Sequence, residues 1–308
     1  MDYVGRTPAP PLDRLVDDVY VLTGTPRHRR LNVPPMPSAH LFVNLGGPAR
    51  LWDPASPRPP DVVTDGWFMG LWTRRFEIEH HDPVRLVGVH FKPWGLAPFT
   101  GVAPSELRDR WVPADAVWGP AVGRMRDRLA DAPSTSQVLD RLEEELRRRL
   151  DPEPPRGLAL VHHTTRRLAG SGGTVPVGRL VADAGVSADH LVNQFRRHVG
   201  VTPKRVARIY RFAALILSVD ARGPVDWPGL AHTAGFFDQA HLGREFKEFT
   251  GHTPTAYLRL RQRFPAVPDF PPDSGPMPAD EISPSVTATD GDSIGGTSTP
   301  DEEDPWPR

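Results

Sequence analysis

Residues 227–257 read WPGLAHTAGFFDQAHLGREFKEFTGHTPTAY, and this stretch decides the fold of the C-terminal half. Gly235 follows a first run of helical spacing and can adopt the left-handed conformation that turns one helix sharply into the next. Asp238 can then accept hydrogen bonds from the free N–H groups that open a second helix. That helix is expected to bury Leu242 and Phe246. The stretch therefore predicts two helices joined by a tight turn.

The opposite face of the second helix is polar. Gln239, Arg244 and Lys247 fall on it, next to the small residue Gly243. A helix with an apolar back and a front of Gln, Arg and Lys suits the major groove of DNA. The alternative is an ordinary helical hairpin with a solvated face, and both interpretations fit this stretch when it is taken alone.

An internal repeat favours the first interpretation. Seven residues recur 51 positions later in the same order. The pairs are His190 and His241, Leu191 and Leu242, Phe195 and Phe246, Arg196 and Lys247, Gly200 and Gly251, Thr202 and Thr253, and Pro203 and Pro254. The repeat predicts two helix-turn-helix units joined by a connecting helix over residues 208–219. The second helix of each unit, here called the recognition helix, can then enter one of two major-groove segments roughly 34 Å apart.

The repeated residues resemble the AraC/XylS family of bacterial transcription regulators. The resemblance rests on Phe195-Arg196 with Gly200-Val201-Thr202-Pro203, and on Phe246-Lys247 with Gly251-His252-Thr253-Pro254. It extends over residues 157–262, about a third of the chain. It implies an AraC-type transcription regulator that binds double-stranded DNA with sequence specificity.

The resemblance also implies which residues read bases. Matched one by one, the family's base-reading positions fall on Asp189, Asn193, Gln239, Ala240 and Arg244. Gln and Asn can read adenine and Arg can read guanine, so the second unit is chemically suited to the role. Asp189 departs from this chemistry, because phosphates repel a carboxylate even though it can accept a hydrogen bond from cytosine N4. The first unit is therefore expected to contribute less to affinity.

Charge is distributed unevenly along the chain. Residues 174–264 hold 13 Lys and Arg against 7 Asp and Glu, a net charge of +6, which fits a nucleic-acid partner. Phosphate contacts are expected from four of these cations, with a solvated basic face as the alternative. They are Arg196, Arg197, Lys204 and Lys247. Residues 265–308 hold 1 against 10, a net charge of −9, and predict a disordered acidic tail. That tail either competes with phosphate for the cations or only keeps the chain soluble.

The composition excludes several classes of protein. The chain has no cysteine, which excludes disulfides, thiolate chemistry and zinc sites with Cys ligands. It also excludes a methyl-acceptor repair protein of the kind that can carry an AraC-like domain. No apolar run reaches the ~18–20 residues of a membrane helix. The N-terminus MDYVGRTPAP lacks the apolar stretch of a signal peptide. A cytoplasmic protein with no membrane partner is expected.

The first half of the chain predicts an α+β domain over residues 1–150, with a small sheet followed by helices. Strands are expected where aromatic and branched residues alternate with polar ones, at residues 40–45, 67–73, 75–80 and 85–91. Helices are expected at residues 117–129 and 136–150. Residues 1–11 are rich in proline and are expected to be loose. The charged, proline-rich residues 151–156 predict a linker to an all-α domain over residues 157–264.

Parts of this first domain resemble a poorly characterised N-terminal domain found on some AraC-like regulators. The matching residues are Gly88–Lys92, Gly95, Phe99-Thr100-Gly101, Glu106–Arg110, Val112-Pro113 and Trp118-Gly119. This second family implies no defined ligand. In AraC-like proteins generally such a domain senses an effector or mediates dimerisation, so a small-molecule effector and a homodimer are further expectations.

An enzyme is the alternative from another class. His40, His80, His81 and His90 lie on or beside predicted strands, as in a metal- or cofactor-dependent barrel fused to a DNA-binding module. However, no two show H-x-H spacing, and His80 and His81 are adjacent and so face opposite ways. No nucleophile elbow, P-loop or dinucleotide fingerprint occurs. We therefore expect no catalytic residue, metal or cofactor. A non-specific DNA-binding protein is the third alternative.

Overall fold

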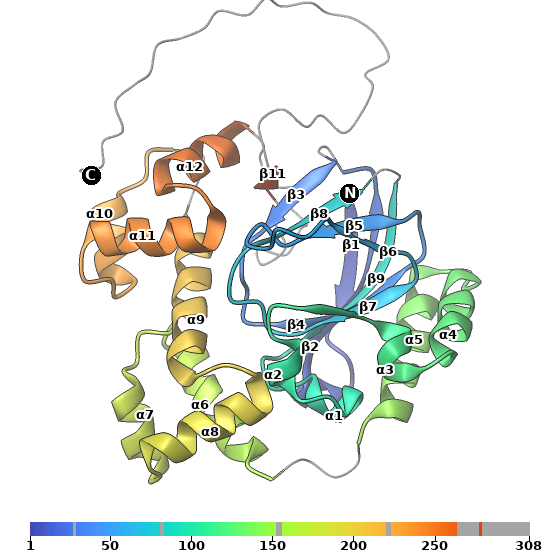
Figure 1. Cartoon of the computed structure of the whole chain (residues 1–308), viewed down its shortest axis with the longest axis horizontal. Coiled ribbons are helices and arrows are strands. Elements are labelled where there is room, and N and C mark those ends of the chain that lie inside the picture. Colours follow the sequence, from blue (N-terminus) through green and yellow to red (C-terminus); the bar gives the residue numbers. More distant parts are fainter. Residues whose placement is uncertain (27–28, 81–82, 152–155, 220–222, 264–276, 279–308) are drawn as a thin grey trace, which may run out of the picture.

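The computed structural model describes six segments of the chain. They are residues 1–26, 29–80, 83–151, 156–219, 223–263 and 277–278. The N-terminal part holds two β-sheets with helices beside them, and the described residues between 158 and 263 form helices joined by short turns (Figure 1). The expected order, an α+β region followed by an all-α region, is confirmed.

The two sheets are antiparallel and face each other. The six-stranded sheet has the order β1 (Asp2–Arg6), β2 (Val16–Gly24), β9 (Val84–Phe91), β4 (Ala39–Asn44), β7 (Gly66–Met69) and β10 (Trp111–Pro113). The five-stranded sheet has the order β11 (Met277–Pro278), β3 (Arg30–Val33), β8 (Phe76–His80), β5 (Ala49–Trp52) and β6 (Asp61–Val63).

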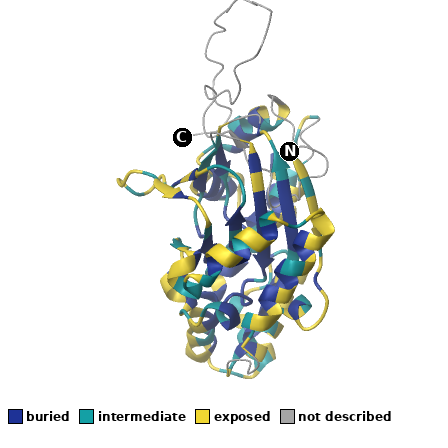
Figure 2. Ribbon diagram, turned by 90° about the vertical axis from the view of Figure 1, so that its right-hand side faces the viewer, coloured by how far each residue is buried: buried dark blue, intermediate teal, exposed yellow. Residues whose placement is uncertain are grey.

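Side chains of the six-stranded sheet alternate between two cores, as the period of a strand requires. In β9, Val87 and Val89 pack towards the helices, whereas Leu86 packs between the sheets. Both faces of this sheet are therefore covered, which explains why β9 is a nearly continuous apolar run. Figure 2 shows the buried residues concentrated along these central strands.

Short helices cover the outer face of the six-stranded sheet. They are η1 (Leu12–Arg14), α1 (Ala97–Thr100), α2 (Pro104–Leu107), α3 (Ala114–Trp118), α4 (Ala121–Ala130) and α5 (Thr135–Arg149). The amphipathic helix α5 begins at Ser134, whose side chain accepts a hydrogen bond from Gln137 N, and it packs Leu142 and Leu146 into the core.

Three expectations for this region are wrong. The strand expected at residues 67–73 ends at Met69. The helix expected over residues 117–129 is two helices, because Gly119 adopts φ +68° and Pro120 follows it. Residues 1–11 are not all loose, because residues 2–6 form β1 and pair with β2. Four further strands were not expected, because they are three or four residues long and too short to show a period; they are β3, β5, β6 and β10.

The C-terminal region contains the two expected helix-turn-helix units. Its helices are α6 (Leu158–Gly170), α7 (Val177–Ala184), α8 (Ala188–Val199), α9 (Pro203–Ser218), α10 (Trp227–Thr233), α11 (Gln239–Thr250) and α12 (Pro254–Arg263). Helices α7 and α8 form the first unit and α10 and α11 the second. Figure 1 shows the recognition helices, α8 and α11, at opposite ends of the connecting helix α9.

The turn chemistry expected for the second unit is confirmed, and the first unit has the same turn. Gly185 and Gly235 have φ angles of +63° and +71°. Asp238 accepts a hydrogen bond of 2.6 Å from His241 N at the start of α11. One boundary differs, because α9 begins at Pro203 and not at residue 208. Thr202 accepts a hydrogen bond from Arg205 N, and proline is favourable in a first helical turn.

The two regions pack against each other through the ends of the recognition helices. Gly200, which ends α8, lies so close to α2 that a Cβ there would be 2.5 Å from the carbonyl oxygen of Pro104. Its repeat partner Gly251, which ends α11, would place a Cβ 2.8 Å from Arg75 Nε. Trp94 of the N-terminal region belongs to the core of the helical region.

Two expected segments fall mostly beyond the described part of the chain. Most of the expected linker, residues 152–155, lies outside it, as does most of the expected disordered tail. Within the tail, Met277 and Pro278 are the exception, since they form β11 and pair with Asn32 and Leu31 of β3.

Candidate nucleic-acid interface and inter-sheet pocket

Helix α8 presents its expected contacts to solvent. Leu191 and Phe195 are fully buried on its inner face. The expected contact residues are all exposed, and they are Asp189, Asn193, Arg196 and Arg197. Asp189 lies in the first turn, where the helix dipole favours a negative charge.

Helix α11 has the same arrangement. Leu242, Phe246 and Phe249 have no exposed surface and form its back. The expected contact residues on its front are all exposed, and they are Gln239, Ala240, Arg244 and Lys247. The helix begins at Gln239, so Gln239 and Ala240 stand at its N-terminal end, where residues of a recognition helix meet base edges.

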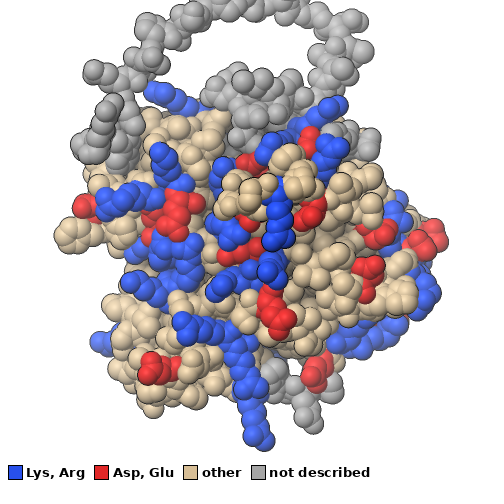
Figure 3. Space-filling view, viewed as in Figure 1, with Lys and Arg blue, Asp and Glu red and all other residues tan. Residues whose placement is uncertain are grey.

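A groove joins two of the expected contacts. Lys204 is exposed in the first turn of α9 and Arg244 in α11, and both border a hollow that residues 173–177 also line. A cation of the connecting helix and a cation of the second recognition helix therefore border one concave surface. Figure 3 shows basic residues interleaved with acidic ones over the side of the molecule where α9 and α11 lie.

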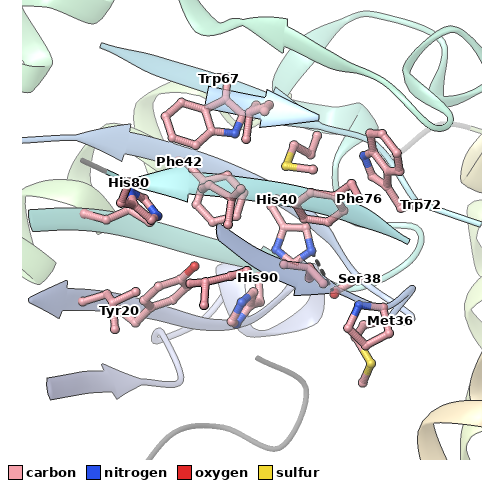
Figure 4. A pocket seen from close by; sticks show the side chains of 18 of the residues that line it. Tyr20, Met36, Ser38, His40, Phe42, Trp67, Trp72, Phe76, His80 and His90 are labelled. Carbon is pink, nitrogen blue, oxygen red and sulfur yellow. Dashed lines mark hydrogen bonds between the residues drawn. The ribbon is translucent and has the colours of Figure 1, made fainter. Parts of the chain in front are cut away.

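A second hollow, here called the inter-sheet pocket, lies between the two sheets. Its volume is about 110 Å³. The six-stranded sheet contributes Tyr20, Phe42 and Trp67 to its walls, and Phe76 comes from the five-stranded sheet. Trp72, which follows β7, closes one end. Figure 4 shows these aromatic rings gathered around the hollow, with His40 and His90 among them.

The polar groups of the pocket come from neighbouring strands. His40 Nε2 is hydrogen-bonded to Ser38 Oγ at 3.2 Å, and His90 Nδ1 to Asp18 Oδ1 at 2.6 Å. The ring of Tyr20 stacks on His90 with centroids 4.6 Å apart. Gly88, one of the residues that carry the N-terminal resemblance, makes room for that ring, because a Cβ there would lie 2.1 Å from Tyr20 Cζ.

Burial and neighbouring polar groups together set the pKa values of His40 and Asp18. It holds the pKa of His40 well below the usual 6.5, and the nearby His90 lowers it further, so His40 is neutral near pH 7. Burial by itself would raise the pKa of Asp18. The hydrogen bond and charge of His90 and a hydrogen bond from Tyr3 outweigh burial and leave that pKa lowered.

Three of the four histidines that were considered for a metal site lie in this pocket. His40, His80 and His90 all line the inter-sheet pocket, while His81 lies outside the described residues. In the part of the chain that the structure describes, no three His, Asp or Glu side chains are grouped so that they could hold a metal ion.

Two family matches cover most of the described fold. Residues 180–260 match a family described as a helix-turn-helix domain. Residues 6–113 match a domain of unknown function, DUF6597. The chain carries an AraC-type helix-turn-helix domain. The protein is accordingly a DNA-binding regulator of transcription. No curated protein matches the sequence.

Several solved structures are distantly similar to this chain. One is ToxT from Vibrio cholerae O395, with 13% identity and a TM-score of 0.42, covering 78% of this chain and 95% of ToxT. Another is wild-type ToxT from Vibrio cholerae strain SCE256 with an unsaturated fatty acid bound, with 14% identity, a TM-score of 0.41 and coverage of 78% and 93%. The AraC-like transcriptional activator CuxR has 10% identity, a TM-score of 0.27 and coverage of 64% and 76%.

The AraC-type domain also contains an ion-pair cluster that the sequence analysis missed. Arg208 Nε of α9 lies 2.8 Å from Glu245 Oε2 of α11, and Arg208 Nη2 lies 2.6 Å from Glu248 Oε2. Arg205 binds Glu248 at 2.7 Å and Arg211 binds Glu245 at 3.0 Å. The spacing of three residues on each helix is the signal that could have revealed it, because such residues share one helix face.

This cluster reduces the number of arginines that are available to bind DNA phosphates. Burial alone would raise the pKa of Glu248, but hydrogen bonds from Arg208 and Arg205 outweigh it and leave the pKa lowered. Three of the arginines between residues 174 and 264 are thus engaged with carboxylates inside the domain. The count of 13 Lys and Arg therefore overstates the number of cations that are available to phosphate.

Among the described residues, the structure contains no helix that is both long enough and apolar enough to cross a membrane.

Proposed function

We propose that this regulator recognises a specific DNA sequence through α8 and α11, and that a small molecule in the inter-sheet pocket controls it. The single observation that carries the proposal is the pair of capped recognition helices, each with an apolar back and an exposed polar front. We assign residues 157–264 to DNA binding and residues 1–150 to sensing.

The side chains on the fronts of the recognition helices support particular base contacts. Gln239 can read adenine, Arg244 can read guanine, and the methyl group of Ala240 can meet the methyl group of thymine. In the first unit, Asn193 can read adenine, and Asp189 can accept from cytosine N4. All five side chains are exposed.

The phosphate contacts are assigned to Arg196, Arg197, Lys204 and Lys247. Each is exposed on or directly after a recognition helix, and no ion pair in the described structure engages any of them. Neutralising phosphates releases counterions, so affinity should fall steeply as salt rises.

A link between the pocket and the DNA-binding region supports control by a ligand. Trp72 lines the pocket, and the next residue, Thr73, accepts a hydrogen bond from Arg205 Nη2 of α9 through its carbonyl oxygen. A ligand that moves Trp72 therefore acts next to the helix that joins the two units. A homodimer remains an expectation from the family resemblance.

Selection of bound duplexes from a random DNA pool tests sequence recognition. We expect enrichment of two short motifs whose centres lie about 10–10.5 base pairs apart, one for each unit. The double variant Gln239→Ala with Arg244→Ala should lose one motif and keep the other. Binding without any enriched motif would mean that the protein is a non-specific DNA-binding protein.

A further inference from the structure

We propose that the inter-sheet pocket takes a small, uncharged molecule with a single aromatic ring and a hydrogen-bond acceptor. This inference rests on the proposed function only for the role of the ligand as an effector. The choice of ligand class rests on the pocket itself, through its lining, its unpartnered donors and its volume.

The lining disfavours a charged ligand. None of the described residues that border the pocket is Lys, Arg, Asp or Glu. His40 is held neutral by burial, and His90 is already bonded to the carboxylate of Asp18. Because His90 is already paired with Asp18, a carboxylate or ammonium group brought into this space would lose its hydration without a new ion pair to offset that loss, which is strongly unfavourable.

Two buried indole N–H groups of the pocket lack a hydrogen-bond acceptor in the described part of the chain. Trp67 and Trp72 are 1% and 3% exposed and both line the pocket. The indole Nε1 of each is buried and has no hydrogen-bond partner among the described residues. His40 Nδ1 is also buried without a partner in the described structure, and it donates or accepts according to the tautomer of the ring. Buried N–H groups in native proteins are nearly always paired, so these atoms mark a place where a ligand oxygen or nitrogen completes the site.

Shape and volume select a single ring. Figure 4 shows the rings of Phe42, Trp67, Trp72 and Phe76 around the hollow, and flat aromatic walls favour an aromatic ligand stacked between them. The volume of about 110 Å³ is close to the roughly 150 Å³ of an apolar cavity that binds benzene. A long fatty chain or a fused polycyclic molecule exceeds this space.

The decisive experiment compares four probes of similar size on the full-length protein at pH 7.5. Acetophenone is uncharged and carries an acceptor, toluene lacks the acceptor, and benzoate and benzylammonium carry opposite charges. We expect calorimetry to show acetophenone binding about threefold to tenfold more tightly than toluene, the worth of one hydrogen bond. Benzoate and benzylammonium should bind at least about tenfold more weakly than acetophenone. Equal or tighter binding of either ion, or no binding of any probe, overturns the proposal.

Variants locate the binding to the pocket. Trp67→Phe and Trp72→Phe each remove one indole donor, so at least one should reduce acetophenone affinity to the level of toluene while toluene affinity stays unchanged. Val33→Phe fills the pocket from β3 and should abolish binding of both probes. Val62→Phe is the matched control, because Val62 is exposed on β6 of the same sheet and does not line the pocket. Loss of binding in Val62→Phe, or unchanged binding in Val33→Phe, places the ligand elsewhere.

A second measurement separates the ligand class from the proposed function. The affinity for a selected duplex is measured with and without acetophenone at saturation. Binding of acetophenone without any change in DNA affinity leaves the ligand class standing and overturns only the effector role.

Discussion

Asn32 donates a hydrogen bond of 2.7 Å from Nδ2 to the carbonyl oxygen of Thr250, the last residue of recognition helix α11. Its neighbours on β3, Leu31 and Val33, line the inter-sheet pocket. Because side chains alternate along a strand, one short strand forms the wall of the pocket with one face and holds the recognition helix with the other. We therefore expect a ligand that displaces β3 to move α11 as well.

The Asn32 contact can be tested by substitution. Asn32 is 2% exposed, and its own Oδ1 has no partner, so Asn32→Ala removes one hydrogen bond together with one unsatisfied acceptor. We expect the free energy of unfolding in urea to fall by about 1 kcal/mol. Asn32→Asp should cost about 2–3 kcal/mol, because a carboxylate oxygen then faces the carbonyl of Thr250. The surface control Asn193→Ala should cost less than about 0.5 kcal/mol. Equal losses for Ala and Asp would show that this hydrogen bond does not matter.

Arg244 distinguishes base reading from phosphate contact. Arg244→Ala should weaken binding to a selected duplex by about 1–3 kcal/mol and relax the preference at one base pair, because a bidentate guanine contact is lost. Lys247→Ala is the control on the same helix, and it should weaken binding to selected and random duplexes alike. If both variants weaken both duplexes equally in titrations at fixed salt, Arg244 contacts phosphate and the base-reading assignment is wrong.

Asp189 should affect stability and DNA affinity in opposite directions. Its carboxylate in the first turn of α8 interacts favourably with the helix dipole, so Asp189→Asn should lower the free energy of unfolding by about 0.3–1 kcal/mol. The same change removes repulsion from phosphate and should tighten DNA binding, with a gain that shrinks as salt rises. Loss of site preference in Asp189→Asn would instead show that the carboxylate reads a base.

The pKa of His40 predicts a pH dependence of stability. Because this pKa is lowered in the folded protein, the unfolded chain binds a proton first as the pH falls below about 6.5. The free energy of unfolding should therefore decrease from about pH 6.5 downwards, by at most about 1.4 kcal/mol per pH unit from this group. His162 and His198, whose pKa values burial also lowers, act in the same direction.

Urea unfolding between pH 5 and pH 8 isolates the contribution of His40. His40→Phe should flatten the slope below pH 6.5, whereas Ser38→Ala removes only the hydroxyl partner of His40 and should keep it. An unchanged slope in His40→Phe would mean that other groups account for the pH dependence.

Local signals in the sequence were enough to predict the helix-turn-helix units. Caps such as Asp238 and turns such as Gly235 act within four residues, so their chemistry can be read along the chain. A single unit cannot be told from an ordinary helical hairpin. The internal repeat indicated that the chain contains two such units. The exposed placement of the expected contact residues follows from helical periodicity alone.

The pocket and the ion-pair cluster could not be predicted in the same way. The pocket collects residues from strands of both sheets, and β3 and β5 are too short to show a period. Their strand character comes from pairing with β8, which is distant in sequence. The cluster joins arginines to glutamates some 34–43 residues away, and only the packing of α9 on α11 brings them together.

The cluster should contribute to stability through Glu245 more than through Glu248. Glu245 is 3% exposed and accepts from both Arg208 and Arg211, whereas the Glu248 side chain is 43% exposed. Removing one partner of a buried pair leaves an uncompensated charge and costs up to about 3–5 kcal/mol, while an exposed pair contributes about 0–1 kcal/mol. Because the two arginines are partly exposed, we expect Glu245→Gln to cost about 2–3 kcal/mol and Glu248→Gln less than about 1 kcal/mol in urea unfolding.

Glu245→Gln has a functional consequence as well. Glu245 lies on the buried face of α11, so the change touches no proposed DNA contact, yet it releases α11 from α9. Binding to a selected duplex should therefore weaken more than binding to random DNA, since base reading requires both recognition helices in register. Equal stability losses in the two variants, with DNA specificity unchanged, would show that the cluster neither holds α11 nor sets the spacing of the two units.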